Sequence, residues 1–93
     1  MLFDWDPAKN RRNIRAHGIA FADAVQVFVG ATWERLDDRA DYGEERWVAI
    51  GLMDGIEVTV VYTDRRTPDG VVRRMISARR ATSDEREAYY RSL

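Results

Sequence analysis

Arginines are the residues of this chain with the clearest capacity for chemistry. Several fall in segments whose alternation predicts strands, and those on a common side of a sheet would converge. They are Arg46, Arg73, Arg74, Arg79 and Arg80. A guanidinium stays charged and binds phosphate through two parallel hydrogen bonds. Strand arginines are more often solvated surface residues, and a GC-rich genome also favours arginine, so this pattern alone establishes no phosphate site.

Two side chains could act as an acid or a base, and RNA cleavage without a metal is one reaction that would use them beside arginines, although composition and spacing do not by themselves select that reaction. In that reaction the ribose 2′-hydroxyl is the nucleophile, and the protein supplies a base, an acid and positive donors. A histidine titrates near neutrality, which makes His17 a candidate, although a histidine at a helix end is as often a cap. Glu45 is a candidate base oriented by Arg46; the alternative is an ordinary ion pair at a strand entry.

Aromatic residues offer a further means of binding RNA, because an unstacked base can lie on an aromatic ring. The candidates are Trp5, Trp33, Trp47, Tyr62, Tyr89 and Tyr90. Most aromatic side chains of so short a chain must fill the core. We therefore expect only one or two of them to face RNA.

The elements that position these residues begin with a strand and two helices. A short apolar run at Leu2–Trp5 predicts the strand. The Asp6-Pro7 pair supplies an N-cap and a first-turn residue for a helix over Pro7–His17, which Gly18 ends. Apolar residues at helical spacing predict a second helix over Phe21–Phe28.

A meander of strands is predicted to follow. Strands expected at Arg46–Met53 and Ile56–Thr63 flank Asp54-Gly55, a dipeptide that favours a hairpin turn with two positive φ angles. Thr32–Leu36 predicts an earlier strand, and alternation over Val71–Ala78 predicts a later one.

The end of the chain predicts a turn, a strand and a helix. Thr67–Gly70 has the composition of a turn, which leads into the last strand. Thr82 and Glu85 have the spacing of a capping box, so a short helix is expected over Ser83–Arg91. Hairpin connections predict an antiparallel sheet, because parallel strands need crossovers for which there is little room. The expected class is α+β, with two N-terminal helices and a short C-terminal helix collected on one face of the sheet.

Length and composition predict a single domain over residues 1–93, since 45% apolar residues are enough to fill one core. Cysteine is absent, and one histidine makes a zinc site improbable; neither a metal nor a cofactor is implied. No apolar run is long enough for a membrane span, and Asp4, Asp6 and Lys9 stand where a secretory leader would be apolar, so a soluble protein that is not exported is expected. A reducing, cytoplasmic setting is expected.

Charge is distributed unevenly along the chain. The formal net charge is −1, which excludes a protein whose whole surface attracts nucleic acid. Residues 34–45 hold six acids against two arginines, whereas residues 65–91 hold eight arginines against four acids. Any RNA site must therefore be a local patch.

Several segments, in order, resemble the BrnT toxin family. They are Phe3-Asp4-Trp5-Asp6-Pro7-Ala8-Lys9, Asn13, His17-Gly18-Ile19, Phe21-Ala22-Asp23-Ala24, Gly43-Glu44-Glu45-Arg46, Val60-Val61-Tyr62-Thr63, Arg74-Met75-Ile76-Ser77-Ala78-Arg79-Arg80-Ala81, Glu85 and Tyr89-Tyr90. The resemblance covers nearly the whole chain. Two features depart from it: Ala16 stands where a basic residue is expected, and the Thr67–Gly70 turn is lengthened.

The resemblance implies a RelE-like fold and a ribonuclease toxin of a type II toxin–antitoxin system. It also implies a ribbon-helix-helix antitoxin of the BrnA kind, with operator DNA bound only through that antitoxin. Carried over by residue, it points to Trp5, His17, Arg46, Ser77, Arg79 and Arg80 as functional positions, to which the residues themselves add Glu45.

Our interpretation is an endoribonuclease in which arginines stabilise the phosphorane-like transition state and His17 or Glu45 moves protons. One alternative is a non-catalytic module that binds an antitoxin and acts only in transcriptional regulation; its expression would leave growth and RNA intact. Another is a nucleic-acid-binding domain without catalysis, for which the sequence has no helix-turn-helix or zinc pattern.

Overall fold

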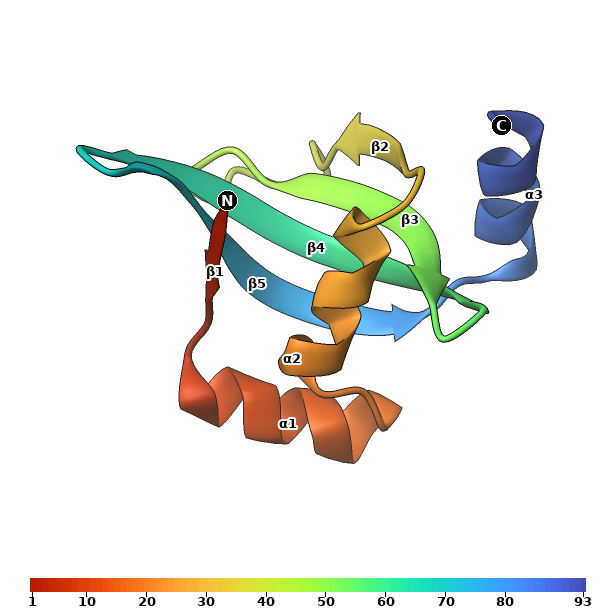
Figure 1. The fold of residues 1–93 in the computed structure, drawn as a ribbon, viewed down its shortest axis with the longest axis horizontal. Helices are drawn as coiled ribbons and strands as arrows, with labels where there is room; N and C mark the ends of the chain where they lie inside the picture. The colour runs from red at the N-terminus through yellow and green to blue at the C-terminus, as the bar shows by residue number, and fades with distance from the viewer.

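A five-stranded sheet forms the centre of the structure, a computed structural model that describes residues 1–93 (Figure 1). The strand order across the sheet is β1-β5-β4-β3-β2. In chain order the elements are β1 (Leu2–Asp4), α1 (Pro7–His17), α2 (Phe21–Ala24), the 3₁₀ helix η1 (Val25–Phe28), β2 (Trp33–Leu36), β3 (Trp47–Met53), β4 (Ile56–Thr67), β5 (Gly70–Arg80) and α3 (Ser83–Arg91).

The sheet is mixed, so the predicted antiparallel sheet is wrong at one edge. β1 pairs in parallel with β5, with Leu2 opposite Val72 and Asp4 opposite Arg74. The other three pairings are antiparallel. The prediction considered only crossovers between neighbouring strands of the chain, whereas here almost the whole domain lies between the two paired strands. The α+β class itself is confirmed.

Two hairpins build the centre of the sheet. Asp54 and Gly55 form the β3–β4 turn with φ angles of 51° and 76°, as the dipeptide predicted. In the β4–β5 hairpin the turn is shorter than predicted, since Pro68 and Asp69 alone lie outside the strands. Both strands consequently extend further, and residues 64–72 form an arm that projects beyond the sheet (Figure 1).

Helix α1 begins and ends as its sequence predicts. The Asp6 carboxylate accepts a hydrogen bond from the Ala8 N–H at 3.0 Å, and Pro7 opens the first turn. Gly18 ends the helix with φ of 71°, a left-handed conformation that costs glycine little. The capping box between Thr82 and Glu85 is likewise present at the start of α3.

The predicted helix over Phe21–Phe28 is in fact two short pieces, α2 and η1. The second half contains Val25 and Val27, whose β-branched side chains are stiff in a helix. η1 also lies very close to β3, because a Cβ placed on Gly51 would lie 2.9 Å from Val27 Cγ1 and from its carbonyl oxygen. Glycine on the strand is therefore what allows this approach.

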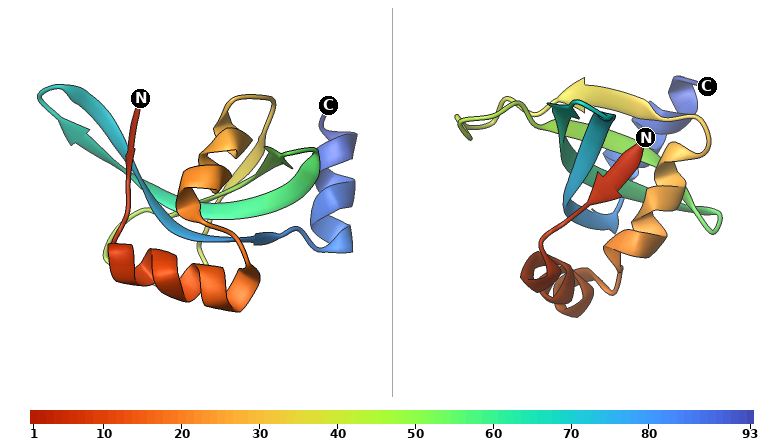
Figure 2. Two further views of the ribbon diagram at one scale, coloured as in Figure 1. Left: turned by 60° about the horizontal axis from the view of Figure 1, so that its bottom comes forward. Right: turned by 60° about the vertical axis from the view of Figure 1, so that its left-hand side comes forward.

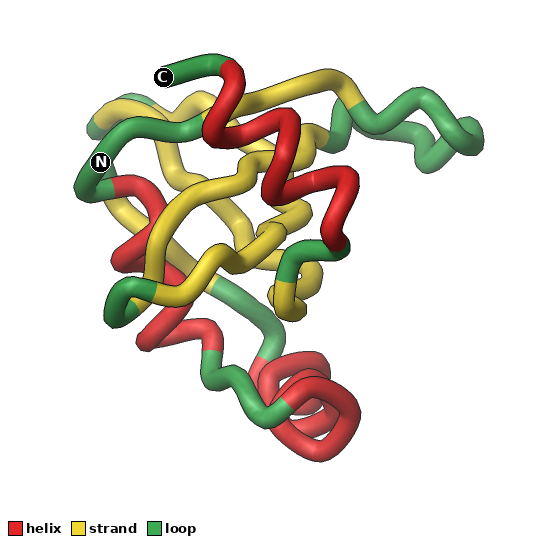
Figure 3. The backbone as a smooth tube through the Cα atoms, turned by 90° about the vertical axis from the view of Figure 1, so that its right-hand side faces the viewer, coloured by secondary structure: helices red, strands yellow, loops and turns green.

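The helices lie on both faces of the sheet, not on one face as predicted. α2 and η1 cover the face that presents Ala49, Val60 and Tyr62, which we call the α2 face. Tyr89 of α3 packs against Ile50, which alternates with Ala49 and points to the opposite side, the α3 face. Figure 3 views the sheet from the α3 side. None of these helices combines the length and apolarity that a membrane crossing needs.

Asn13 attaches α1 to the edge of β5, along which the helix runs (Figure 2). Its side chain is 6% exposed. The amide donates to the carbonyls of Ile19 and Ala78 at 2.8 and 2.9 Å, and its oxygen accepts from the Ala78 N–H at 3.1 Å. The amide thus occupies the place of another strand at this point of β5.

We predict that Asn13→Ala lowers the free energy of unfolding by about 3 kcal/mol, because the Ala78 N–H and C=O lose their partner in a buried place. Urea denaturation measures the change. Arg11→Ala, on the exposed side of the same helix, is the matched control and changes stability by less than about 0.5 kcal/mol. Equal stability of the two variants would contradict the anchoring role.

Candidate active site

The α3 face carries two of the residues that sequence reasoning selected on β5, Ser77 and Arg79. The pairing of Ile50, Thr59 and Arg79 across three strands places Arg79 on this face. Val61 pairs with Ser77 one row further along. Side chains two residues apart on a strand share a face, so Ser77 and Arg79 do. This face is therefore the one on which predicted site residues gather.

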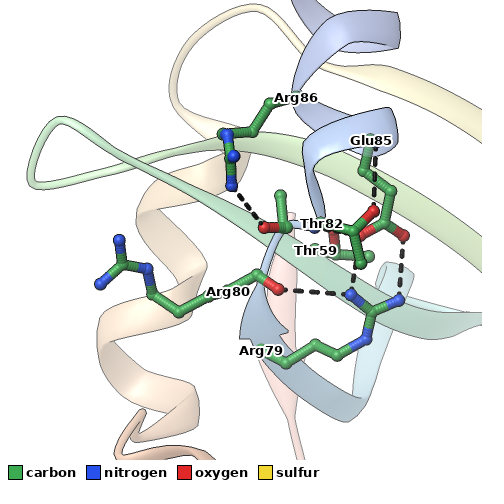
Figure 4. Close-up of polar contacts among 7 residues, drawn as sticks. Thr59, Arg79, Arg80, Thr82, Glu85 and Arg86 are labelled. Atoms are coloured by element: carbon green, nitrogen blue, oxygen red, sulfur yellow. Dashed lines mark hydrogen bonds and ion pairs between the residues drawn. The ribbon is translucent and has the colours of Figure 1, made fainter.

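Arg79 is held in place by Glu85 at the start of α3 (Figure 4). The two guanidinium nitrogens donate to the two carboxylate oxygens at 2.7 and 2.9 Å. The same carboxylate accepts from the Thr82 N–H at 2.8 Å and from the Thr59 hydroxyl at 3.1 Å. The Arg79 side chain remains 38% exposed. It is a fixed cation with one side open to solvent.

The ionisation of this pair follows from its geometry. The hydrogen bond to Glu85 raises the pKa of Arg79. Burial by itself would raise the pKa of Glu85, but hydrogen bonds from Arg79 and Thr82 outweigh it and hold that pKa at about 2. Both groups are therefore charged at neutral pH.

Arg46 and Glu45 lie where the loop from residue 37 joins β3. The Arg46 guanidinium carbon lies 4.1 Å from the centre of the Tyr42 ring, and its Nε donates to Glu44 at 3.2 Å. Its side chain is 23% exposed. The Glu45 carbonyl accepts from the Thr63 hydroxyl at 2.6 Å, while the residue is exposed to solvent. This part of the loop is thus attached to β4.

The loop also has an internal anchor at Asp37. This buried carboxylate accepts from the Arg39 Nε at 2.8 Å and from its terminal nitrogen at 2.9 Å. These hydrogen bonds are the main reason that the pKa of Asp37 lies below its usual value. The acidic segment is therefore partly an internal ion pair and not wholly a solvated run of charge.

His17 lies beside the part of β5 that carries Ser77. An open groove of about 300 Å³ separates α1 from β5, and it is lined by Lys9, Arg12, Asn13, Ala16, His17 and Ile76. β5 has an irregularity at this point, because Val61 pairs with Ser77 but the next residue of β4, Tyr62, pairs with Met75. The extra residue, Ile76, belongs to the groove. At the bulge, His17 of α1 therefore lies close to β5, the strand that carries Ser77.

The remaining predicted residues lie elsewhere. Trp5 is half-buried and packs edge-on against the Phe21 ring, with 6.1 Å between ring centres. Arg80 is exposed, and its side chain points away from Arg79 in Figure 4. Its carbonyl accepts from the Arg79 guanidinium at 3.3 Å. The structure therefore places Ser77 and Arg79 on one face beside the His17 groove, Glu45 and Arg46 on the loop, and Trp5 and Arg80 apart from both.

One polar cluster on the α2 face was not expected. Arg73 is 13% exposed and lies 4.7 and 4.0 Å from the ring centres of Phe28 and Tyr62. Its guanidinium donates to both oxygens of Asp64 at 2.9 Å, and the Tyr62 hydroxyl donates to Glu34. Burial and that hydrogen bond raise the pKa of Tyr62. Arg73 was one of the arginines considered for a phosphate site, with a solvated surface position as the alternative, yet it packs against the aromatic rings of Phe28 and Tyr62.

Sequence reasoning also missed Lys9 and Arg12 of the groove. A signal was present, because α1 contains no acidic residue at all. The structure has no group of three or more His, Cys, Asp or Glu side chains placed to hold a metal ion.

Comparison with known proteins identifies the protein family of this chain. A family model matches residues 5–85, and its proteins are ribonuclease toxins of type II toxin–antitoxin systems. The chain belongs to that family, BrnT. A type II system implies a protein antitoxin as partner. No curated protein matches the chain significantly.

We predict that Glu85→Gln destabilises the protein most near neutral pH. Because the folded-state pKa of Glu85 is depressed to about 2 from an ordinary 4.5, its ionic contribution is fully present above pH 4.5 and is lost as pH falls towards 2. The gap in melting temperature between wild type and variant should narrow over that range. Glu87→Gln, in an exposed pair with Arg91, is the control. A gap that stays constant with pH would refute the assignment.

Proposed function

We propose that this chain is a metal-independent endoribonuclease of the cytoplasm, inhibited by a ribbon-helix-helix antitoxin, with a fold related to RelE-type ribonucleases. In the proposed reaction a base removes the proton of a ribose 2′-hydroxyl, whose oxygen then attacks the adjacent phosphorus. The bond from phosphorus to the 5′-oxygen breaks, and an acid protonates that oxygen. The products are a 2′,3′-cyclic phosphate and a 5′-hydroxyl end.

The observation that carries this proposal is the meeting of α1 and β5 at the bulge. His17 lines a groove with Ile76, the residue before Ser77, and Arg79 follows two residues later on the same face as Ser77. His17 of α1 therefore borders the same short stretch of β5 that carries the Ser77 hydroxyl and the fixed cation Arg79. In the proposed site Arg79 and Arg46 donate to the phosphate oxygens, Ser77 orients them, and His17 or Glu45 moves protons.

The pairing of Arg79 with Glu85 favours its role as a transition-state donor. A donor that is already fixed needs no reorganisation as charge develops on the phosphate. Thr59 and Thr82 also donate hydrogen bonds to the Glu85 carboxylate. The fixed carboxylate in turn sets the orientation of the Arg79 guanidinium. The 38% of the side chain that stays exposed is the part available to RNA.

The antitoxin is proposed to cover this same face. A site that receives phosphate through exposed cations is equally open to acidic side chains of a protein, so occupation by the partner would exclude RNA. Operator DNA would then be bound through the antitoxin alone.

One observation favours the alternative of a non-catalytic regulatory module. The cations of the proposed site already have acidic partners, with Arg46 paired to Glu44 and Arg79 paired to Glu85. A phosphate must compete with these carboxylates. If it cannot, the chain would bind its antitoxin without cleaving RNA.

The test compares the free chain, its complex with the protein encoded beside it, and the Arg46→Ala variant, each incubated with RNA in EDTA. We expect the free chain to cleave and to leave cyclic-phosphate ends, because the reaction needs no metal. The complex should be inactive, and Arg46→Ala should be slower by about 10²-fold, the usual loss for one transition-state donor. Uncleaved RNA with the free chain would favour the regulatory module.

His17→Gln separates catalysis from capping. If His17 moves a proton, the variant loses about 10²- to 10⁴-fold in kcat while its melting temperature stays near that of wild type. If His17 only stabilises the end of α1, the variant cleaves normally and melts at a lower temperature. Single-turnover cleavage and thermal unfolding, measured on the same preparation, distinguish the two roles.

A further inference from the structure

The cations of this protein divide into paired and unpaired groups. Eight ion pairs engage eight arginines, most of them on the sheet, its loop or α3. These are Arg39, Arg46, Arg65, Arg73, Arg74, Arg79, Arg86 and Arg91. The four cations of α1, namely Lys9, Arg11, Arg12 and Arg15, take part in none of these pairs, and α1 has no acid of its own. Arg35, Arg66 and Arg80 are also outside these pairs, so α1 holds four of the seven unpaired lysine and arginine side chains in this protein of net charge −1.

Part of that charge faces the groove at β5. Lys9, Arg12 and His17 line it, and no carboxylate does. Lys9 and His17 lie eight residues apart on one side of the helix, a distance of about 12 Å along its axis. The three basic side chains are therefore spread along the length of the groove, and we call this row of residues the track.

Hydrogen bonds between α1 and β5 hold the two sides of the groove together. One of these sides, β5, is the strand that carries the proposed catalytic residues. Asn13 is buried beneath the groove and bonded to the backbone of Ala78, so α1 cannot slide along β5 without breaking those bonds. Ile76 of the bulge forms the β5 side, directly before Ser77. A chain lying in the groove would run onto the face that carries Ser77 and Arg79.

We propose that the groove between α1 and β5 binds the phosphate backbone of single-stranded RNA and leads it to the β5 site. This inference rests on the proposed ribonuclease function and assigns its substrate-binding track to Lys9 and Arg12. The groove suits a charged backbone better than a protein segment, because Ala16 and Ile76 are its only apolar residues. Protein interfaces usually depend on a cluster of buried aromatic or aliphatic anchors, whereas Ile76 is the only large apolar residue of this groove.

Binding is measured by fluorescence anisotropy with the full chain and a labelled 12-nucleotide RNA in which every ribose carries a 2′-O-methyl group. That probe has no nucleophile, so it binds without being cut. Lys9→Ala/Arg12→Ala should weaken binding by about tenfold or more and reduce the salt dependence of log K by about 1.4, since each phosphate contact to a single strand contributes about 0.7.

The matched control is Arg11→Ala/Arg15→Ala, which removes two exposed cations of the same helix that do not line the groove. We expect it to weaken binding by no more than about twofold, because long-range attraction alone is lost. Lys9→Gln/Arg12→Gln serves as the second variant if the alanine pair fails to fold. Equal losses of RNA affinity in the two double variants would overturn the proposal. Failure of the wild-type protein to bind the probe would also overturn it.

Two further measurements separate this inference from the proposed function. With cleavable RNA the groove variant should raise KM and leave kcat at saturating RNA nearly unchanged. If wild type binds the probe through the groove but cuts no RNA, the track stands and the ribonuclease proposal fails. If wild type cuts RNA and the groove variant does so with unchanged KM, the track is wrong. If the variant loses only binding to the antitoxin, the groove is a protein site and the proposal is overturned.

Discussion

The buried amide of Asn13 is the contact on which the arrangement of α1 depends. A side chain that is 6% exposed must satisfy its polar atoms inside the protein, and this one does so with the backbone of Ile19 and Ala78. Those bonds fix both the distance and the register between α1 and β5. The groove, the position of His17 and the nearness of both to the bulge at Ile76 all follow from that register.

Many of the arginines of this protein are used within the fold. Arg73 lies between two aromatic rings and Asp64, and it helps to close the core. Arg79 ties β5 to the first turn of α3 through Glu85. Such cations stabilise the fold, whereas the four cations of α1 take part in no ion pair. The number of arginines does not distinguish these two groups.

Local signals were sufficient for most of the elements, though not for the division of the predicted Phe21–Phe28 helix into α2 and η1, and they were insufficient for the arrangement of the elements. The Asp54-Gly55 turn and the caps of α1 and α3 depend on neighbours within a few residues, so the sequence predicted them. The parallel pairing of Leu2 with Val72 joins opposite ends of the chain, and no local pattern encodes it. The same holds for α3, whose side of the sheet is fixed by Tyr89 meeting Ile50, and for the bulge that brings the His17 groove to Ser77. The candidate residues could thus be named in advance, but not which of them come together.

The arm of residues 64–72 has a consequence for the behaviour of the protein in concentrated solution. Beyond Tyr62, β4 no longer pairs with β3, so one edge of the arm has unpaired backbone groups. An open edge of this kind is a template for strand addition by another molecule, and hence for aggregation. Arg65 and Arg66 are exposed on that stretch, and Pro68 at the tip has no N–H to donate. Charge and proline at such an edge are the usual safeguards against strand addition, so a long hairpin can project from the domain with its open edge protected.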